Sequence, residues 1–80
     1  MLGVPKEWNY EQVFDTFDLG CGDLLLELRT RMASIAPGAR VVVASRDAGA
    51  PVDLPAWCRV TGHILHEAHP PFFLIEKRRK

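Results

Sequence analysis

The segment Val41-Val42-Val43-Ala44 constrains the fold of this chain more than any other part of the sequence. Residues 40–45 form an almost continuous apolar, β-branched run, which is typical of a central strand buried on both faces of a sheet. Just before it, residues 22–36 show an apolar stripe at helical spacing, and Pro37-Gly38 ends the pattern. The stripe consists of Leu25, Leu28, Met32 and Ile35, broadened by Leu24. The sequence therefore predicts a helix that leads directly into a central strand.

Residues 12–18 alternate, though not strictly, in polarity and predict a first strand before that helix. The helix then connects two strands of one sheet, and such a unit is parallel and almost always right-handed. After a loop at residues 46–52, Asp53 is the expected N-cap of a second helix, and Gly62 is expected to end it. The apolar face of the second helix comprises Leu54, Trp57, Cys58 and Thr61.

Residues 63–67 and 72–76 predict two further strands, joined by a turn at His69-Pro70-Pro71. The order of elements is β-α-β-α-β-β, within one domain over residues 12–80. Residues 1–11 show no clear period, and we interpret them as an N-terminal arm from which Trp8 and Tyr10 dock on the domain.

Composition excludes several classes of function. The net charge at pH 7 is zero, whereas nucleic-acid binding usually needs a basic face. No apolar run approaches the roughly 20 residues of a membrane-spanning helix. The first residues lack the apolar core of a signal peptide, so we expect a cytoplasmic protein. In that reducing compartment, Cys21 and Cys58 are expected to be free thiols.

Cys21 is the candidate catalytic residue because it lies where the first strand pattern ends and the leucine-rich helix begins. Unpaired N–H groups and the positive end of the helix dipole favour the thiolate, the reactive form of cysteine. Gly22 and Asp23 follow it in the first turn. Arg46 and Asp47 follow the second strand, and parallel strands end at one edge of a sheet. We therefore expect all four residues beside Cys21 as binding residues.

Three strings carry a family resemblance. Asp15 stands six residues before Cys21; Asp53-Leu54-Pro55-Ala56-Trp57-Cys58 precedes Gly62-His63; and the last predicted strand reads Phe72-Phe73-Leu74-Ile75-Glu76-Lys77. Over roughly residues 12–77 the chain resembles the TusA family of sulfur carriers, also called SirA-like proteins. That family shows an Asp, then Gly-Leu-x-Cys-Pro-x-Pro, and later Asp-Ile-Pro-x-x-Cys.

The resemblance implies an α+β two-layer sandwich, with two helices on one face of a four-stranded mixed sheet, similar to the C-terminal domain of translation initiation factor three. It implies that Cys21 accepts a sulfane sulfur as a persulfide and relays it. The partners implied are a donor protein, such as a cysteine desulfurase or a rhodanese-like protein, and an acceptor protein. Neither a cofactor nor a metal is expected.

The chain departs from the family at its reactive motif. Cys-Pro-x-Pro is replaced by Cys21-Gly22-Asp23-Leu24, and Asp18 stands where the family has Gly. Carboxylates near a thiol raise its pKa. Arg46, at a position where the family commonly has Asp, offsets the added carboxylate in our hypothesis. The alternative is a non-catalytic interaction or regulatory module that kept the fold. RNA binding, suggested by fold analogy alone, is a weaker alternative.

Cys58 lies on the apolar stripe of the second helix, so we interpret it as structural; a second reactive thiol or a Cys21–Cys58 redox pair is the less favoured interpretation. His63 and His66 are three apart on a strand and point to opposite faces, so a metal site with His69 is not favoured. His63, next to Gly62, is interpreted as a packing or helix-end histidine.

Overall fold

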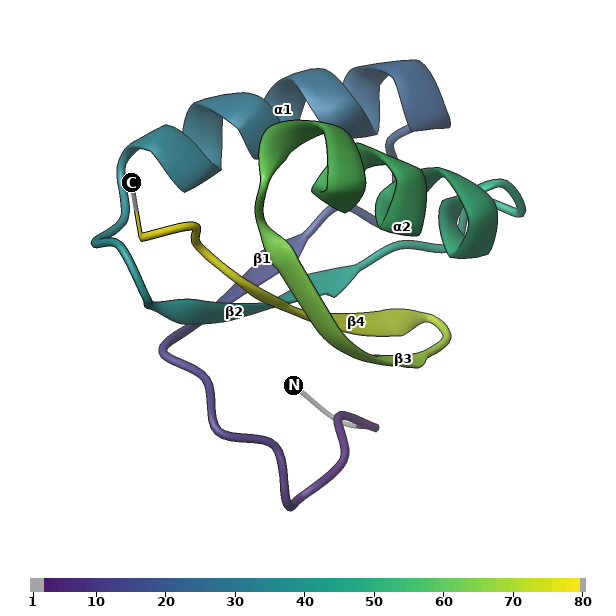
Figure 1. The fold of residues 1–80 in the computed structure, drawn as a ribbon. Coiled ribbons are helices and arrows are strands. Elements are labelled where there is room, and N and C mark those ends of the chain that lie inside the picture. Colours follow the sequence, from purple (N-terminus) through teal and green to yellow (C-terminus); the bar gives the residue numbers. More distant parts are fainter. Residues whose placement is uncertain (1–2, 80) are drawn as a thin grey trace.

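A four-stranded mixed sheet carries both helices on one of its faces (Figure 1). This computed structural model describes residues 3–79, apart from the side chain of Cys21. The elements are β1 (Gln12–Asp15), α1 (Cys21–Ala33), β2 (Arg40–Ala44), α2 (Ala50–Thr61), β3 (Ile64–His69) and β4 (Phe72–Glu76). The α+β fold and the predicted order of elements are confirmed. The predicted turn at 69–71 narrows to Pro70 and Pro71, because β3 extends to His69.

The strands lie in the order β1-β2-β4-β3, with β1 parallel to β2 and the other two pairs antiparallel. The predicted central strand is confirmed, since β2 lies between β1 and β4. Val41 and Val43 pack under the helices, whereas Val42 and Ala44 face the opposite side of the sheet. Alternate side chains of a strand point to opposite faces, so an uninterrupted apolar run is what burial on both faces requires.

The buried stripe of α1 is formed by Leu24, Leu28 and Met32, each at most 1% exposed. The predicted stripe contained all three, and its other members, Leu25 and Ile35, are partly buried and pack at its flanks. The helix ends at Ala33, three residues before the predicted end. Ser34 closes it: the Ser34 N–H donates to the Arg31 carbonyl at 3.1 Å, and the Ile35 N–H donates to the Met32 carbonyl at 3.4 Å.

The start of α2 differs from the prediction, since its N-cap is Gly49 and Asp53 lies within its first turn. The cause is Asp47, whose Oδ2 accepts the Gly49 N–H at 2.9 Å and whose carbonyl accepts the Ala50 N–H at 3.1 Å. Pro51 follows at a position where its missing N–H has no helical partner to lose. The predicted stop at Gly62 is confirmed, because Gly62 takes the left-handed conformation at φ 85°.

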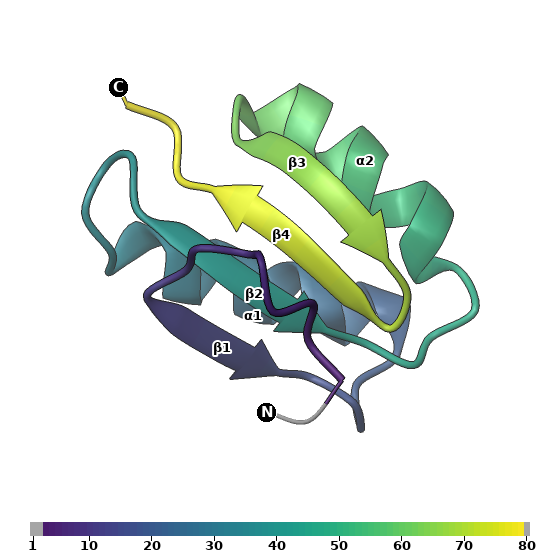
Figure 2. The same ribbon diagram turned by 90° about the horizontal axis from the view of Figure 1, so that it is seen from below.

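The N-terminal arm crosses the sheet face that carries no helix (Figures 1 and 2). Trp8 is 6% exposed and packs in a second apolar cluster with Val42, Ala44, Phe72 and Leu74. The predicted docking of Trp8 is therefore confirmed, whereas Tyr10 is 37% exposed. The arm thus shields apolar positions of both central strands from water.

In the part of the chain that the structure describes, no helix is long and apolar enough to cross a membrane.

Trp8→Ala should lower the free energy of unfolding by about 3 kcal/mol, because it removes a large buried side chain and leaves a cavity against the sheet. Urea unfolding measures the change. Tyr10→Ala is the matched control and should change stability by less than about 0.5 kcal/mol. Equal effects of the two substitutions would show that the arm does not stabilise the sheet through Trp8.

Candidate functional site

The loop between β1 and α1 is held against the end of β2. Thr16 donates both its N–H, at 2.9 Å, and its hydroxyl, at 2.6 Å, to the carbonyl of Ala44. Asp15 Oδ1 accepts the N–H of Phe17 at 3.1 Å, and the Leu19 N–H donates to the Thr16 carbonyl at 3.0 Å. These bonds fix the path of the chain immediately before Cys21. The Asp of the family motif, here Asp15, thus shapes the loop through its side chain.

Cys21 is the first residue of α1, and its N-cap is Gly20, which offers no side-chain cap. The first turn of the helix closes with the Leu24 N–H on the Gly20 carbonyl at 2.8 Å. The leading N–H groups therefore point out of the helix without a capping side chain, at the positive end of its dipole. The side chain of Cys21 lies outside the described residues, so the exposure and reactivity of the thiol stay predictions.

The backbone on both sides of Cys21 is open. An added Cβ at Gly20 or Gly22 would meet no other atom of the described chain within 4 Å, and Gly22 and Asp23 are exposed. A proline at position 22 would disfavour helical backbone at Cys21. Glycine lifts this restriction, so the helix begins at the cysteine. The loss of the motif's first proline therefore has a local structural correlate.

Arg46 lies against the loop that carries Cys21. Its guanidinium stands over the ring of Phe17, 4.3 Å from the ring centroid, a cation–π geometry. Phe17 in turn lies near Phe72, with ring centroids 6.4 Å apart. The structure therefore brings Arg46 to the residues that precede the cysteine, as the parallel β1–β2 pair requires.

Asp47 has a structural task on the same edge. Its N–H donates to Ser45 Oγ at 3.2 Å, and its carboxylate accepts the Gly49 N–H. It therefore shapes the entry into α2. The binding roles of Gly22, Asp23, Arg46 and Asp47 stay predictions.

Cys58 is 3% exposed within the core between α2 and the sheet. Burial raises the pKa of the Cys58 thiol to about 11, so the thiol is neutral near pH 7. This agrees with the structural interpretation and argues against a second reactive thiol. The alternative Cys21–Cys58 pair involves a side chain outside the described residues.

The histidines have separate partners. His63 Nδ1 accepts the Arg78 N–H at 3.0 Å, and its ring lies 5.2 Å from that of Trp57, as a packing histidine at a helix end would. His66 Nε2 is 2.8 Å from Glu76 Oε1. Within residues 3–79, apart from the Cys21 side chain, no three His, Cys, Asp or Glu side chains converge to hold a metal.

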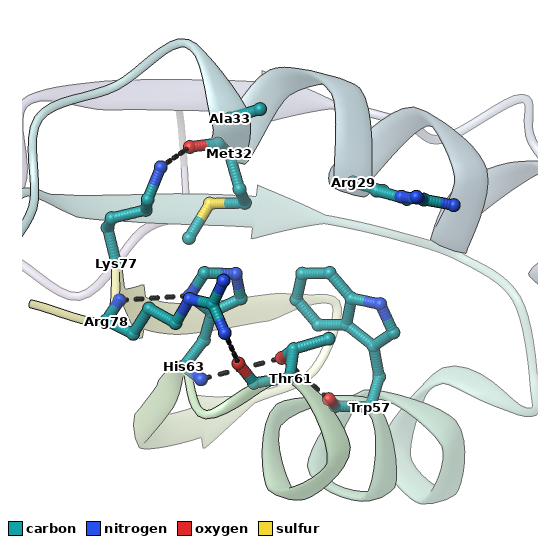
Figure 3. A pocket seen from close by; sticks show the side chains of 8 residues that line it. All are labelled: Arg29, Met32, Ala33, Trp57, Thr61, His63, Lys77 and Arg78. Atoms are coloured by element: carbon teal, nitrogen blue, oxygen red, sulfur yellow. Dashed lines mark hydrogen bonds between the residues drawn. The ribbon is translucent and has the colours of Figure 1, made fainter. Parts of the chain in front are cut away.

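Two features were not predicted from the sequence. Glu76, 4% exposed on the central strand β4, gathers His66, Arg40 and Arg79 around its carboxylate at 2.8–3.5 Å. A cleft of about 390 Å³ opens between the C-terminal ends of the two helices (Figure 3). Two sequence signals could have indicated these features: a glutamate that ends an apolar strand, and the basic segment that follows it.

Glu76→Gln should reduce the loss in the free energy of unfolding that occurs as the pH falls into the acid range. The hydrogen bond from His66, and secondly Arg79, holds the pKa of Glu76 below its ordinary value of 4.5. A carboxyl with a lowered pKa stabilises the fold above its unfolded pKa, and this contribution is lost as pH falls through the folded pKa. Urea unfolding between about pH 3 and 6 measures the loss. Glu67→Gln, at an exposed position, is the control; an unchanged loss at acid pH in Glu76→Gln would contradict the prediction.

The comparison with known proteins places the chain in a family. No model of a known protein family matches it. Two proteins of Neisseria meningitidis, one from serogroup A and one from serogroup B, are each 35% identical to it over 57 residues. The match covers 71% of this chain and 77% of each relative, and both bear the name "Putative sulfur carrier protein". At this identity and coverage, the chain belongs to this sulfur carrier family.

Proposed function

We propose that this protein is a TusA-like sulfur carrier whose Cys21 holds the transferred sulfur as a persulfide. The observation that carries the proposal is the position of Cys21 in a chain of this family, at the first residue of α1 after an N-cap without a side chain. A thiol at an uncapped helix N-terminus gains from the dipole and from unpaired N–H groups, both of which favour the thiolate.

The transfer needs no external oxidant. The Cys21 thiolate attacks the outer sulfur of a donor persulfide, a new S–S bond forms, and the S–S bond of the donor breaks. The inner sulfur of the donor leaves as a thiolate and keeps the electron pair of the broken bond. Delivery to an acceptor thiolate repeats the exchange in the other direction. Such steps depend on the nucleophilicity and accessibility of the attacking thiolate.

The surroundings of the site suit a protein partner. Leu26 is 66% exposed on α1, one turn after Gly22, and Arg29 is exposed one turn further on. Glu27 and Arg31 bind each other at 2.8 Å. The exposed Leu26 would give a donor or acceptor that docks on this part of α1 an apolar contact. We expect the donor to be a cysteine desulfurase or a rhodanese-like protein.

We place the protein in the cytoplasm. Thiols stay reduced there, and a carrier must begin each cycle with a reduced thiol.

Incubation with a sulfane-sulfur donor, followed by intact-mass spectrometry, tests the assignment. We expect the mass of the wild-type chain to rise by one sulfur atom. Cys21→Ser should lose the adduct, and Cys58→Ser, in which the buried neutral thiol is removed, should keep it. A folded wild-type protein without an adduct at Cys21 would favour the non-catalytic interaction module instead.

Arg46→Glu should raise the pKa of the Cys21 thiol and slow its alkylation at pH 7. The substitution replaces a cation by an anion against the loop between β1 and α1, which already carries Asp18 and precedes Asp23. The pH dependence of iodoacetamide alkylation in a Cys58→Ser background measures the change. Arg59→Glu, on the exposed side of α2, makes the same change in net charge as a control. Identical pH profiles for both variants would remove the role of Arg46.

A further inference from the structure

The cleft between the C-terminal ends of α1 and α2 is separate from the cysteine site. Its lining residues come from α1, α2 and the segments that flank β3 and β4: Arg29, Met32, Ala33, Trp57, Thr61, His63, Lys77 and Arg78 (Figure 3). Arg29 lies eight residues after Cys21, or about 12 Å along the helix at 1.5 Å per residue. The volume of the cleft, about 390 Å³, is within the range of small-molecule sites.

The lining is positively charged. Three of the lining residues, Arg29, Lys77 and Arg78, are cationic. No acidic residue of the described chain lines the cleft. The C-terminus of each helix contributes roughly half a negative charge. The balance in the cleft is still about two positive charges, which favours an anion.

Lys77 and Arg78 bind carbonyl groups at the C-terminal ends of the helices, and each has further N–H donors. Lys77 Nζ donates to the carbonyl of Met32 and, at 3.3 Å, to that of Ile35. Arg78 donates one side-chain N–H to the carbonyl of Thr61 at 3.1 Å. An ammonium has three donors and a guanidinium five, so one N–H of Lys77 and four of Arg78 remain.

Arg29 is the third cation, and its side chain has no hydrogen bond or ion pair within residues 3–79. It is exposed on α1 at the rim of the cleft. Its side chain points away from Lys77 and Arg78 (Figure 3), so these two cations, and not Arg29, face a shared anion.

Flat rings form part of the wall. The indole of Trp57 and the imidazole of His63 lie 5.2 Å apart and are tilted by 38°. Burial, followed by the charges of Lys77 and Arg78, lowers the pKa of His63. The ring is therefore neutral at pH 7, and because its Nδ1 accepts the Arg78 N–H, its Nε2 carries the proton and can donate.

We propose that this cleft binds a small organic anion that carries a flat ring, of the class of a nucleoside monophosphate. The anionic group would lie beside Lys77 and Arg78, and the ring against Trp57 and His63 (Figure 3). This site goes beyond the proposed sulfur transfer and does not involve Cys21.

Adenosine 5′-monophosphate is the probe, and the two tryptophans give an internal control. Trp57 lines the cleft, whereas Trp8 is buried on the opposite face of the sheet. In ¹H–¹⁵N spectra of the full chain, assigned with a Trp8→Phe variant, the indole signal of Trp57 should shift and saturate at roughly millimolar probe. The signal of Trp8 should stay in place. No saturable shift of Trp57, or equal shifts of both signals, would overturn the proposal.

Variants and fragments of the probe test the two halves of the proposal. Arg78→Ala should weaken binding at least about fivefold, since it removes a charged partner of the anion. Arg59→Ala removes the same charge outside the cleft and should leave the affinity unchanged; equal losses in both variants would overturn the site. Adenosine and inorganic phosphate should each bind more weakly than the whole probe, and phosphate binding as tightly would overturn the role of the ring. Cys21→Ser should bind the probe like the wild type, so the outcome is independent of sulfur transfer.

Discussion

The antiparallel pairing of β2 with β4 is the constraint on which the rest of the structure depends. The two strands are paired along their length, from Arg40 opposite Glu76 to Ala44 opposite Phe72, and their side chains are buried on both faces. A sheet centre of this kind needs cover above and below. The two helices cover one face of the sheet, and Trp8 of the N-terminal arm covers part of the other face. The parallel β1 joins at β2 and requires a crossover, which is α1. The start of that crossover carries Cys21, so the site follows from the pairing.

The dipole of α1 favours opposite charges at the two ends of that helix. At its N-terminus, unpaired N–H groups favour a negative charge, such as the Cys21 thiolate of the proposed transfer. At its C-terminus, unpaired carbonyls favour cations, and Lys77 lies there. One helix thus supports opposite charges at opposite ends. The segment after β4 serves the second helix in the same way, through Arg78 on the Thr61 carbonyl.

The parts of the fold that depend on local pattern could be predicted from the sequence. The run 41–44 indicated a doubly buried strand, and Gly62 indicated a helix stop, because each depends on its own residues. The start of α2 could not be predicted in this way. Asp53 has the chemistry of an N-cap, but Asp47 closes the turn earlier through its contact with Gly49. The predicted stripe of α1 contained its three buried residues, but helical spacing alone does not say which of the adjacent Leu24 and Leu25 is fully buried against the sheet.

Features built from distant segments escaped prediction for a related reason. The carboxylate of Glu76 is surrounded by residues from two other strands and the C-terminal segment, and the cleft draws on four parts of the chain. No spacing rule links such positions. Within the site, the sequence correctly placed Arg46 on the edge where β1 and β2 end. It could not show that Phe17 would be its contact.

The contact of Trp8 with Phe72 and Leu74 joins nearly opposite ends of the sequence. During synthesis Trp8 is made well before β4, the strand that completes its binding surface. Until then, the indole of Trp8 and the side chains of Val42 and Ala44 stay in contact with water. This second apolar layer therefore closes only once β4 has been made, and a nascent chain that stalls before β4 leaves the apolar side chains of Val42 and Ala44 without their cover.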